Sequence, residues 1–211
     1  MFSLKSPFQI VVAVLVVITG SALGQAQNTD FKIQKIEPDF LHSPGYTGPQ
    51  YDKRGTRGKD WLEVEVTFEW QPPQRAKDRE PRYTDELTFN YYILLKNKPP
   101  QAHETLLVGS VTHTSIPQEK DLHSVVYVSP RTLERFFEGK VPASADQALV
   151  DVGVTITKQG QEVASTSWKS RTGSWWPQFT QTPGFVLDKN ETPFAPLAWD
   201  YYEAIKPRAG E

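Results

Sequence analysis

The clearest pattern in the chain is a strict alternation of apolar and polar residues over Trp61–Trp70. Its even-numbered positions are all apolar, namely Leu62, Val64, Val66, Phe68 and Trp70. The intervening positions are polar and include Glu63, Glu65 and Glu69. Successive residues of a strand point to opposite faces, so this segment predicts a strand with one buried face and one solvent-facing face. The glutamates then solubilise and protect that outer face rather than serving as a catalytic acid and base.

Further segments of the chain predict strands, which cover residues 31–36, 84–96, 105–114, 122–128, 148–157 and 162–169. The first is expected to end at Glu37-Pro38, and Lys158–Gln161 has the glycine of a hairpin turn. No alternation of strands and helices supports a parallel sheet. The pattern predicts an all-β fold, an immunoglobulin-like antiparallel β-sandwich that occupies residues 25–170.

One short helix is expected inside the sandwich, over residues 130–138. Ser129 is a suitable N-cap and Pro130 suits the first helical position. The apolar residues at i, i+3 and i+4 form one stripe. Gly139 can end the helix in a left-handed conformation.

The composition changes after Ser170, where an aromatic and proline-rich C-terminal extension begins (residues 171–211). Disordered segments avoid large aromatic residues, so we expect this extension to dock on the sandwich or on a partner. Thr192 and Pro193 resemble a helix start, and the spacing of later apolar residues predicts a short terminal helix over 194–205. The candidate docking or partner contacts are Trp175, Trp176, Phe185, Phe194, Trp199, Tyr201 and Tyr202.

The N-terminal residues 1–24 have the pattern of a secretory signal peptide. Lys5 precedes an apolar run over Phe8–Ile18, and small residues Ala22 and Gly24 precede Gln25. The run is shorter than the roughly 20 residues that span a bilayer. The sequence therefore predicts cleavage before Gln25, export to the periplasm or cell surface, and no stable membrane anchor after cleavage.

Charge and cysteine content exclude several classes of function. The formal net charge is only −2, which argues against a nucleic-acid partner. The chain has no cysteine, so disulfides, thiolate metal sites, cysteine nucleophiles and a lipidated cysteine are excluded. The stability of the fold must therefore come from an apolar core.

No catalytic, metal-binding or cofactor-binding signature is present. The chain lacks the nucleophile-elbow motif and the glycine-rich phosphate loop. Of its four histidines, His113 and His123 are expected on neighbouring strands, as ordinary surface or cross-strand residues. We predict a protein that is not an enzyme and that binds no cofactor.

The adjacent Trp175 and Trp176 suggest an alternative, because exposed indoles can stack on sugar rings. Neighbouring residues of an extended segment point to opposite faces, so at most one ring could join such a platform. Buried anchoring of the extension is therefore favoured. A carbohydrate-binding β-sandwich module stays open as the alternative function, and an exported enzyme of unfamiliar type as a third.

A resemblance to a known group rests on TPFAPLAWDYYE (Thr192–Glu203), on Gly184-Phe185-Val186-Leu187, and on the order of signal peptide, sandwich and aromatic extension. The chain resembles exported bacterial proteins of immunoglobulin-like fold that are associated with type IV pilus-like assembly systems. The resemblance implies a non-enzymatic accessory or structural role through contacts with other envelope or pilus-system proteins. It implies no catalytic residues.

Overall fold

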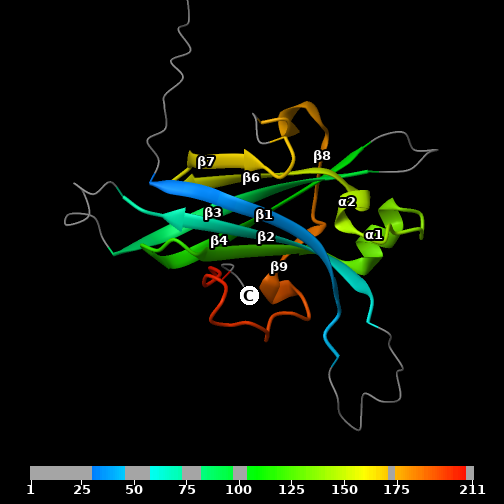
Figure 1. Cartoon of the computed structure of the whole chain (residues 1–211), viewed down its shortest axis with the longest axis horizontal. Coiled ribbons are helices and arrows are strands. Elements are labelled where there is room, and N and C mark those ends of the chain that lie inside the picture. Colours follow the sequence, from blue (N-terminus) through cyan, green and yellow to red (C-terminus); the bar gives the residue numbers. More distant parts are fainter. Residues whose placement is uncertain (1–29, 46–57, 73–81, 97–103, 171–173, 208–211) are drawn as a thin grey trace, which may run out of the picture.

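The computed structural model describes residues 30–45, 58–72, 82–96, 104–170 and 174–207, which form two β-sheets packed face to face (Figure 1). The first sheet has the order β1-β2-β5-β9, with bounds Phe31–His42, Asp60–Trp70, Leu122–Val128 and Val186–Asp188. The second has the order β7-β6-β3-β4-β8, with bounds Gln161–Ser167, Leu149–Lys158, Tyr83–Leu95, Thr105–Pro117 and Gln181–Pro183. The signal-peptide prediction lies outside the described residues.

Without β8 and β9, the strand order is that of an immunoglobulin domain. The strands β1-β2-β5 correspond to A-B-E, and β7-β6-β3-β4 correspond to G-F-C-C′. The all-β sandwich prediction is therefore confirmed. One pair departs from the expected antiparallel arrangement, because β8 runs parallel to β4.

The inner face of β2 supplies the centre of the core. All five even-numbered apolar residues of Trp61–Trp70 are buried, which confirms the predicted alternation. The Phe68 ring meets Phe89 of the opposite sheet edge-on, with 4.8 Å between ring centroids. The Trp70 indole stacks on Phe31 of β1 at 5.6 Å.

Strand β1 is longer than the sequence pattern predicted. It continues through Pro38, which is opposite Val64, as far as His42. The prediction of an end at Glu37-Pro38 is wrong because β1 is an edge strand. An edge strand uses only one side of its backbone for pairing, so it tolerates a proline whose nitrogen faces the free side.

Two short helices lie together at one end of the sandwich, between β5 and β6 (Figure 1). Helix α1 (Pro130–Phe136) has the expected N-cap, since Ser129 Oγ accepts from the Thr132 N–H. The helix ends at Phe136, two residues earlier than the predicted end at Glu138. Gly139 lies beyond this end with φ of 78°. The single turn α2 (Ala145–Ala148) was not predicted.

The β6–β7 hairpin has the turn that its sequence predicted. Gln159 and Gly160 both have positive φ, at 51° and 79°, as a two-residue type I′ turn requires. Lys158 pairs with Gln161 on either side of the turn.

The C-terminal extension adds one strand to each sheet. β8 pairs with β4, and β9 pairs with β5, so the extension crosses from the second sheet to the first. It also contains two 3-10 turns, η2 (Trp176–Gln178) and η3 (Lys189–Glu191). In Figure 1 the extension runs from orange to red, and near its end Ile205 forms a bridge to His113 of β4.

The terminal helix predicted over 194–205 is wrong, because these residues form turns and one bridge between His113 and Ile205. Thr192 does act as a local cap, since its Oγ1 accepts from the Phe194 N–H at 3.2 Å. Pro196 has no N–H to donate to the Thr192 carbonyl, so no α-helical ladder can start there. None of the helices in the described part of the chain is long and apolar enough to cross a membrane.

Candidate functional site

The extension is anchored on the outer face of the second sheet by Trp176. This residue is 5% exposed, and its indole stacks on Tyr92 with 4.6 Å between centroids and 8° between planes. Trp175 meets Trp176 edge-on, with 78° between the ring planes. The two indoles are therefore not coplanar, and Trp176 is covered rather than offered to a sugar ring.

Trp176 lies directly over Gly153 of β6, so Gly153→Ala is expected to displace the indole. A Cβ atom at Gly153 would be 2.4 Å from Trp176 Cε3. We expect a loss of about 1–3 kcal/mol in the free energy of unfolding, measured by urea denaturation. Gly45→Ala is the matched control, because no atom lies within 4 Å of the added methyl. Equal stabilities of the two variants would contradict this docking geometry.

A second anchor holds the extension on the outer face of the first sheet. Phe194 is 3% exposed and stacks on Tyr127 of β5 at 4.8 Å. Its ring also meets Trp61 of β2 edge-on at 5.8 Å. Phe185, between β8 and β9, packs separately against Phe136 of α1.

Beside Phe194, a polar cluster centred on Glu65 holds the last aromatic residues. The Tyr201 and Tyr202 hydroxyls donate to its two carboxylate oxygens at 2.9 and 3.1 Å. His123 Nδ1 lies 3.0 Å from Glu65 Oε1, and the His123 ring stacks on Tyr201 at 4.0 Å. The prediction that the β2 glutamates form an exposed outer face is therefore wrong at Glu65, whose side chain is only 16% exposed.

The phenols of this cluster remain hydrogen-bond donors well above neutral pH. Desolvation, followed by the hydrogen bond to Glu65 and nearby negative charges, raises the pKa of Tyr201. Desolvation and the charges of Glu63 and Glu65 raise the pKa of Tyr202. Burial also raises the pKa of Glu63, against the hydrogen bond from Tyr127, which lowers it. The Tyr201 and Tyr202 hydroxyls therefore stay protonated at neutral pH and keep donating their hydrogen bonds to Glu65.

A buried hydrogen-bond chain joins the sandwich interior to the extension. Tyr91 donates to Ser124 Oγ, which lies 2.7 Å from His113 Nε2. His113 Nδ1 donates to the Glu203 carbonyl at 2.9 Å, so Nε2 of the neutral ring accepts from Ser124. Burial lowers the pKa of His113 to about 4, against backbone hydrogen bonds that raise it.

The Ser124–His113 pair resembles a nucleophile and its base, but no substrate can reach it. Ser124 is 0% exposed and His113 is 1% exposed. The expectation that the two histidines lie on neighbouring strands is wrong, because β4 and β5 belong to different sheets. Neither is a surface residue: His113 faces the core between the sheets, and His123 (7% exposed) makes a cross-strand contact with Glu65 on the covered outer face of the first sheet. Among the described residues, no group of three His, Asp or Glu side chains could hold a metal ion.

The neutral state of His113 predicts that acid weakens the fold. The unfolded chain binds a proton near the ordinary histidine pKa of 6.5, whereas the folded chain does so only near 4. Stability is therefore complete above pH 6.5 and falls by about 3 kcal/mol as the pH drops to 4. Urea denaturation between pH 4 and 7.5 measures this slope.

The control is His113→Gln, which removes this titration. Glu63 and Glu203 have raised pKa values and shift stability in the opposite direction on acidification, so the difference between the two pH profiles isolates His113. Parallel profiles of the native chain and the variant would contradict the neutral buried imidazole.

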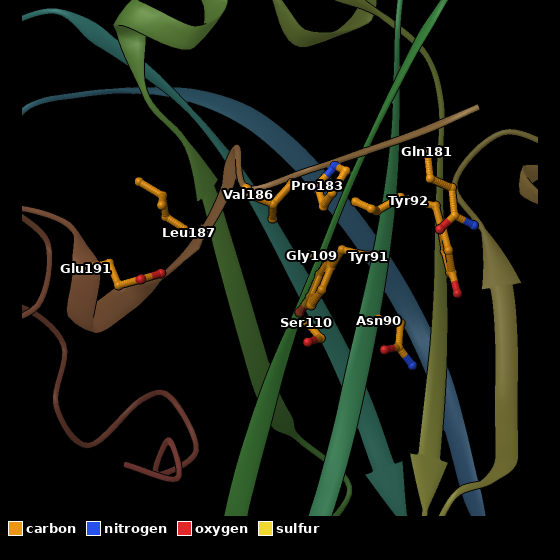
Figure 2. Close-up of a pocket in the computed structure, with 12 residues that line it drawn as sticks. Asn90, Tyr91, Tyr92, Gly109, Ser110, Gln181, Pro183, Val186, Leu187 and Glu191 are labelled. Atoms are coloured by element: carbon orange, nitrogen blue, oxygen red, sulfur yellow. The ribbon is translucent and has the colours of Figure 1, made fainter. Parts of the chain in front are cut away.

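An open cavity of about 450 Å³ lies where the extension crosses from β8 to β9 (Figure 2). In Figure 2 the residues that line this cavity come from β3, β4 and the segment from β8 to η3. Two of its polar side chains serve the fold, because Asn90 donates to Thr155 and Glu191 accepts from the Asp188 N–H. Nothing in this lining suggests a reaction.

The exposed part of the extension is the stronger candidate. Leu197, Trp199 and Tyr201 are 43%, 75% and 48% exposed. These three residues, hereafter the aromatic surface, lie between the buried Phe194 and the half-buried Tyr202. The surface is apolar, and its chemistry fits binding rather than catalysis.

The structure divides the predicted site residues among three places. Trp175 and Trp176 lie on the second sheet, Phe185 lies against α1, and the other four lie on or beside the outer face of the first sheet. The sequence did not indicate the groups that hold the end of the extension, namely Glu65, His113, His123 and Tyr127. Those residues come from several strands of two sheets, and only the tertiary fold brings them together.

The fold and site define an immunoglobulin-like sandwich whose C-terminal extension completes both sheets and presents an apolar surface. The chain belongs to the protein family whose model matches residues 22–209. A crystal structure of a protein from Akkermansia muciniphila has a similar fold, with a TM-score of 0.69 and 23% identity. The alignment covers 84% of this chain and 93% of that chain. No curated protein has a matching sequence.

Proposed function

We propose that this chain is an exported, non-enzymatic protein that acts through protein–protein contacts, as an accessory or structural component of a type IV pilus-like system. The observation that carries the proposal is the aromatic surface, which is exposed although its segment is firmly held. Interfaces between proteins favour Trp and Tyr, and soluble proteins keep exposed apolar patches small. The pilus-like context rests on the resemblance of residues 184–187 and 192–203, which include the first two residues of β9 and the whole aromatic surface.

The carbohydrate-binding alternative receives less support. Its candidate platform, Trp175 and Trp176, is used to anchor the extension. The remaining exposed aromatics, Trp199 and Tyr201, are two residues apart on a turn, and Tyr201 is stacked on His123.

A photo-crosslinking amino acid with an aromatic side chain, placed at position 199 so that a ring is kept there, tests the proposal in the bacterium that produces this chain. We expect adducts with another envelope protein of the pilus-like system, identified by mass spectrometry after purification under denaturing conditions. The control places the same amino acid at Tyr83, which is 58% exposed and outside the extension. The proposal fails if position 199 gives no protein adduct or the same adducts as position 83.

Export is tested separately, because cleavage of the predicted signal peptide gives the mature chain a defined N-terminus. Mass spectrometry of the chain recovered from the producing cell is expected to show an N-terminus at Gln25. Substituting Ala22 and Gly24 by bulky residues should block this processing, since signal peptidases require small residues there. Recovery of a chain that keeps Met1 or Phe8 would refute the export prediction.

A further inference from the structure

The aromatic surface is exposed because its backbone is fixed, not because the segment is loose. Phe194 anchors one side, and the Tyr202 hydroxyl bonds Glu65 on the other. Within the segment, the Leu197 N–H donates to the Phe194 carbonyl at 2.9 Å, and the Tyr201 N–H donates to the Ala198 carbonyl at 3.3 Å. Trp199 is therefore presented on a defined turn.

This turn holds a strained residue directly before Trp199. Ala198 has φ of 49°, in the left-handed region that costs a non-glycine residue about 1–2 kcal/mol. Such strain persists only where surrounding contacts impose it, and it tends to occur at functional sites. Here the surrounding contacts fix the turn that leads Trp199 out into solvent.

Two exposed carboxylates lie next to the aromatic surface. Asp200 is exposed between Trp199 and Tyr201. Asp121, whose side chain is 86% exposed, lies 3.4 Å from Nε2 of His123, and that ring stacks on Tyr201. The acid Glu65 lies beneath Tyr201 and accepts its hydroxyl hydrogen.

Two lysines of this region, Lys189 and Lys35, are engaged with groups of this chain. Lys189 is 6% exposed, and its Nζ donates to the Ala195 carbonyl while lying 6.0 Å from the Trp199 ring. Lys35 pairs with Glu37. An incoming group therefore meets exposed carboxylates and aromatic rings, both of which attract Arg and Lys.

We propose that the aromatic surface, with Asp121 and Asp200, is a docking site for a partner protein segment that carries Arg or Lys beside an apolar residue. The apolar residue contacts Leu197 and Trp199, and the cation lies between the ring faces and the carboxylates. A second copy of this chain would bring its own carboxylates to the same place, so charge disfavours it as the occupant. This inference rests on the proposed function and specifies the chemistry of the partner.

Selection of peptides on the mature chain tests the partner chemistry. The probe is a display library of random 12-residue peptides, counter-selected on the Trp199→Ala variant. We expect enrichment of sequences with Arg or Lys next to a large apolar residue, and depletion of Asp and Glu. One selected peptide is then titrated against ¹⁵N-labelled protein, where the shifted signals should include residues 197–201 and Asp121.

Matched variants measure how much the two carboxylates contribute to binding of the selected peptide. Asp121→Asn with Asp200→Asn should weaken the selected peptide at least tenfold while the melting temperature stays unchanged, and Tyr83→Ala should leave binding unchanged. The inference is overturned by selection without a basic bias, by a library from which no binding peptide survives the counter-selection, or by a Trp199-dependent dimer in sedimentation.

The crosslinking experiment distinguishes this inference from the proposed function. If position 199 still captures an envelope protein after both aspartates are neutralised, the basic partner chemistry is wrong and the proposed function stands. If the double variant loses the adduct that the native charges give, both are supported. If position 199 captures no protein while basic peptides bind there, the pilus-system role fails and the docking chemistry survives.

Discussion

A variant that ends at Ser170 is expected not to reach a stable folded state. It lacks β8 and β9, and it also lacks the anchors Trp176 and Phe194, which are 5% and 3% exposed in the intact chain. Removing a large buried aromatic side chain alone costs about 3–5 kcal/mol. The loss of both anchors is comparable to the whole stability of a domain, about 5–15 kcal/mol.

The truncation also exposes to solvent surfaces that the extension covers in the intact chain. The Tyr92 and Tyr127 rings lose their stacking partners, and His113 loses the Glu203 carbonyl as its acceptor. The edges of β4 and β5 lose their strand partners and can pair with other molecules. We expect aggregation in size-exclusion chromatography and no cooperative melting transition by circular dichroism.

The matched comparison is the full chain with Trp199→Ala. Trp199 belongs to the same extension but is 75% exposed, so its removal should change stability by no more than about 0.5 kcal/mol. The two variants separate the anchoring role of the extension from its binding role. A truncated chain that is folded, soluble and monomeric, with an unchanged melting temperature, would show that the extension is not part of the domain.

Phe68→Ala is expected to destabilise the domain by about 3–5 kcal/mol. The side chain is 0% exposed and spans the space between the sheets to reach Phe89. Truncation to alanine leaves a cavity that close-packed neighbours fill only in part. The free energy of unfolding, from urea denaturation with an unchanged dependence on urea concentration, measures the effect.

Thr67→Ala provides the control on the same strand. Thr67 is the preceding residue, points to the opposite face and is only partly buried. Its truncation should cost less than about 1 kcal/mol. A Phe68→Ala cost below about 1 kcal/mol would be inconsistent with the register of β2 described above.

The sequence alone determined the elements whose physics is local. Alternation over Trp61–Trp70 identified the buried face of β2, because the period of two is a property of any strand. The Ser129 cap and the glycine of the β6–β7 turn were recognised because hydrogen bonding and backbone geometry act within a few residues. The all-β class followed from the sum of such signals.

Local signals were misleading where a distant segment supplies the partner. The spacing of apolar residues over 194–205 suggested a helix, yet Phe194 is held by Tyr127 and Tyr202 by Glu65, both from strands of the first sheet. Pro38 suggested a strand end, but an edge position made it tolerable. In both cases tertiary contacts outweigh the weak preference of a short segment.

Composition showed that the aromatic extension needed burial, because so much apolar area is unfavourable in water. Only the tertiary structure decided which of its residues are buried. Trp176 and Phe194 are anchors, whereas Trp199 stays in solvent on a turn fixed from both sides. That division depends on long-range contacts with β3, β5 and β6, which no pattern within the extension encodes.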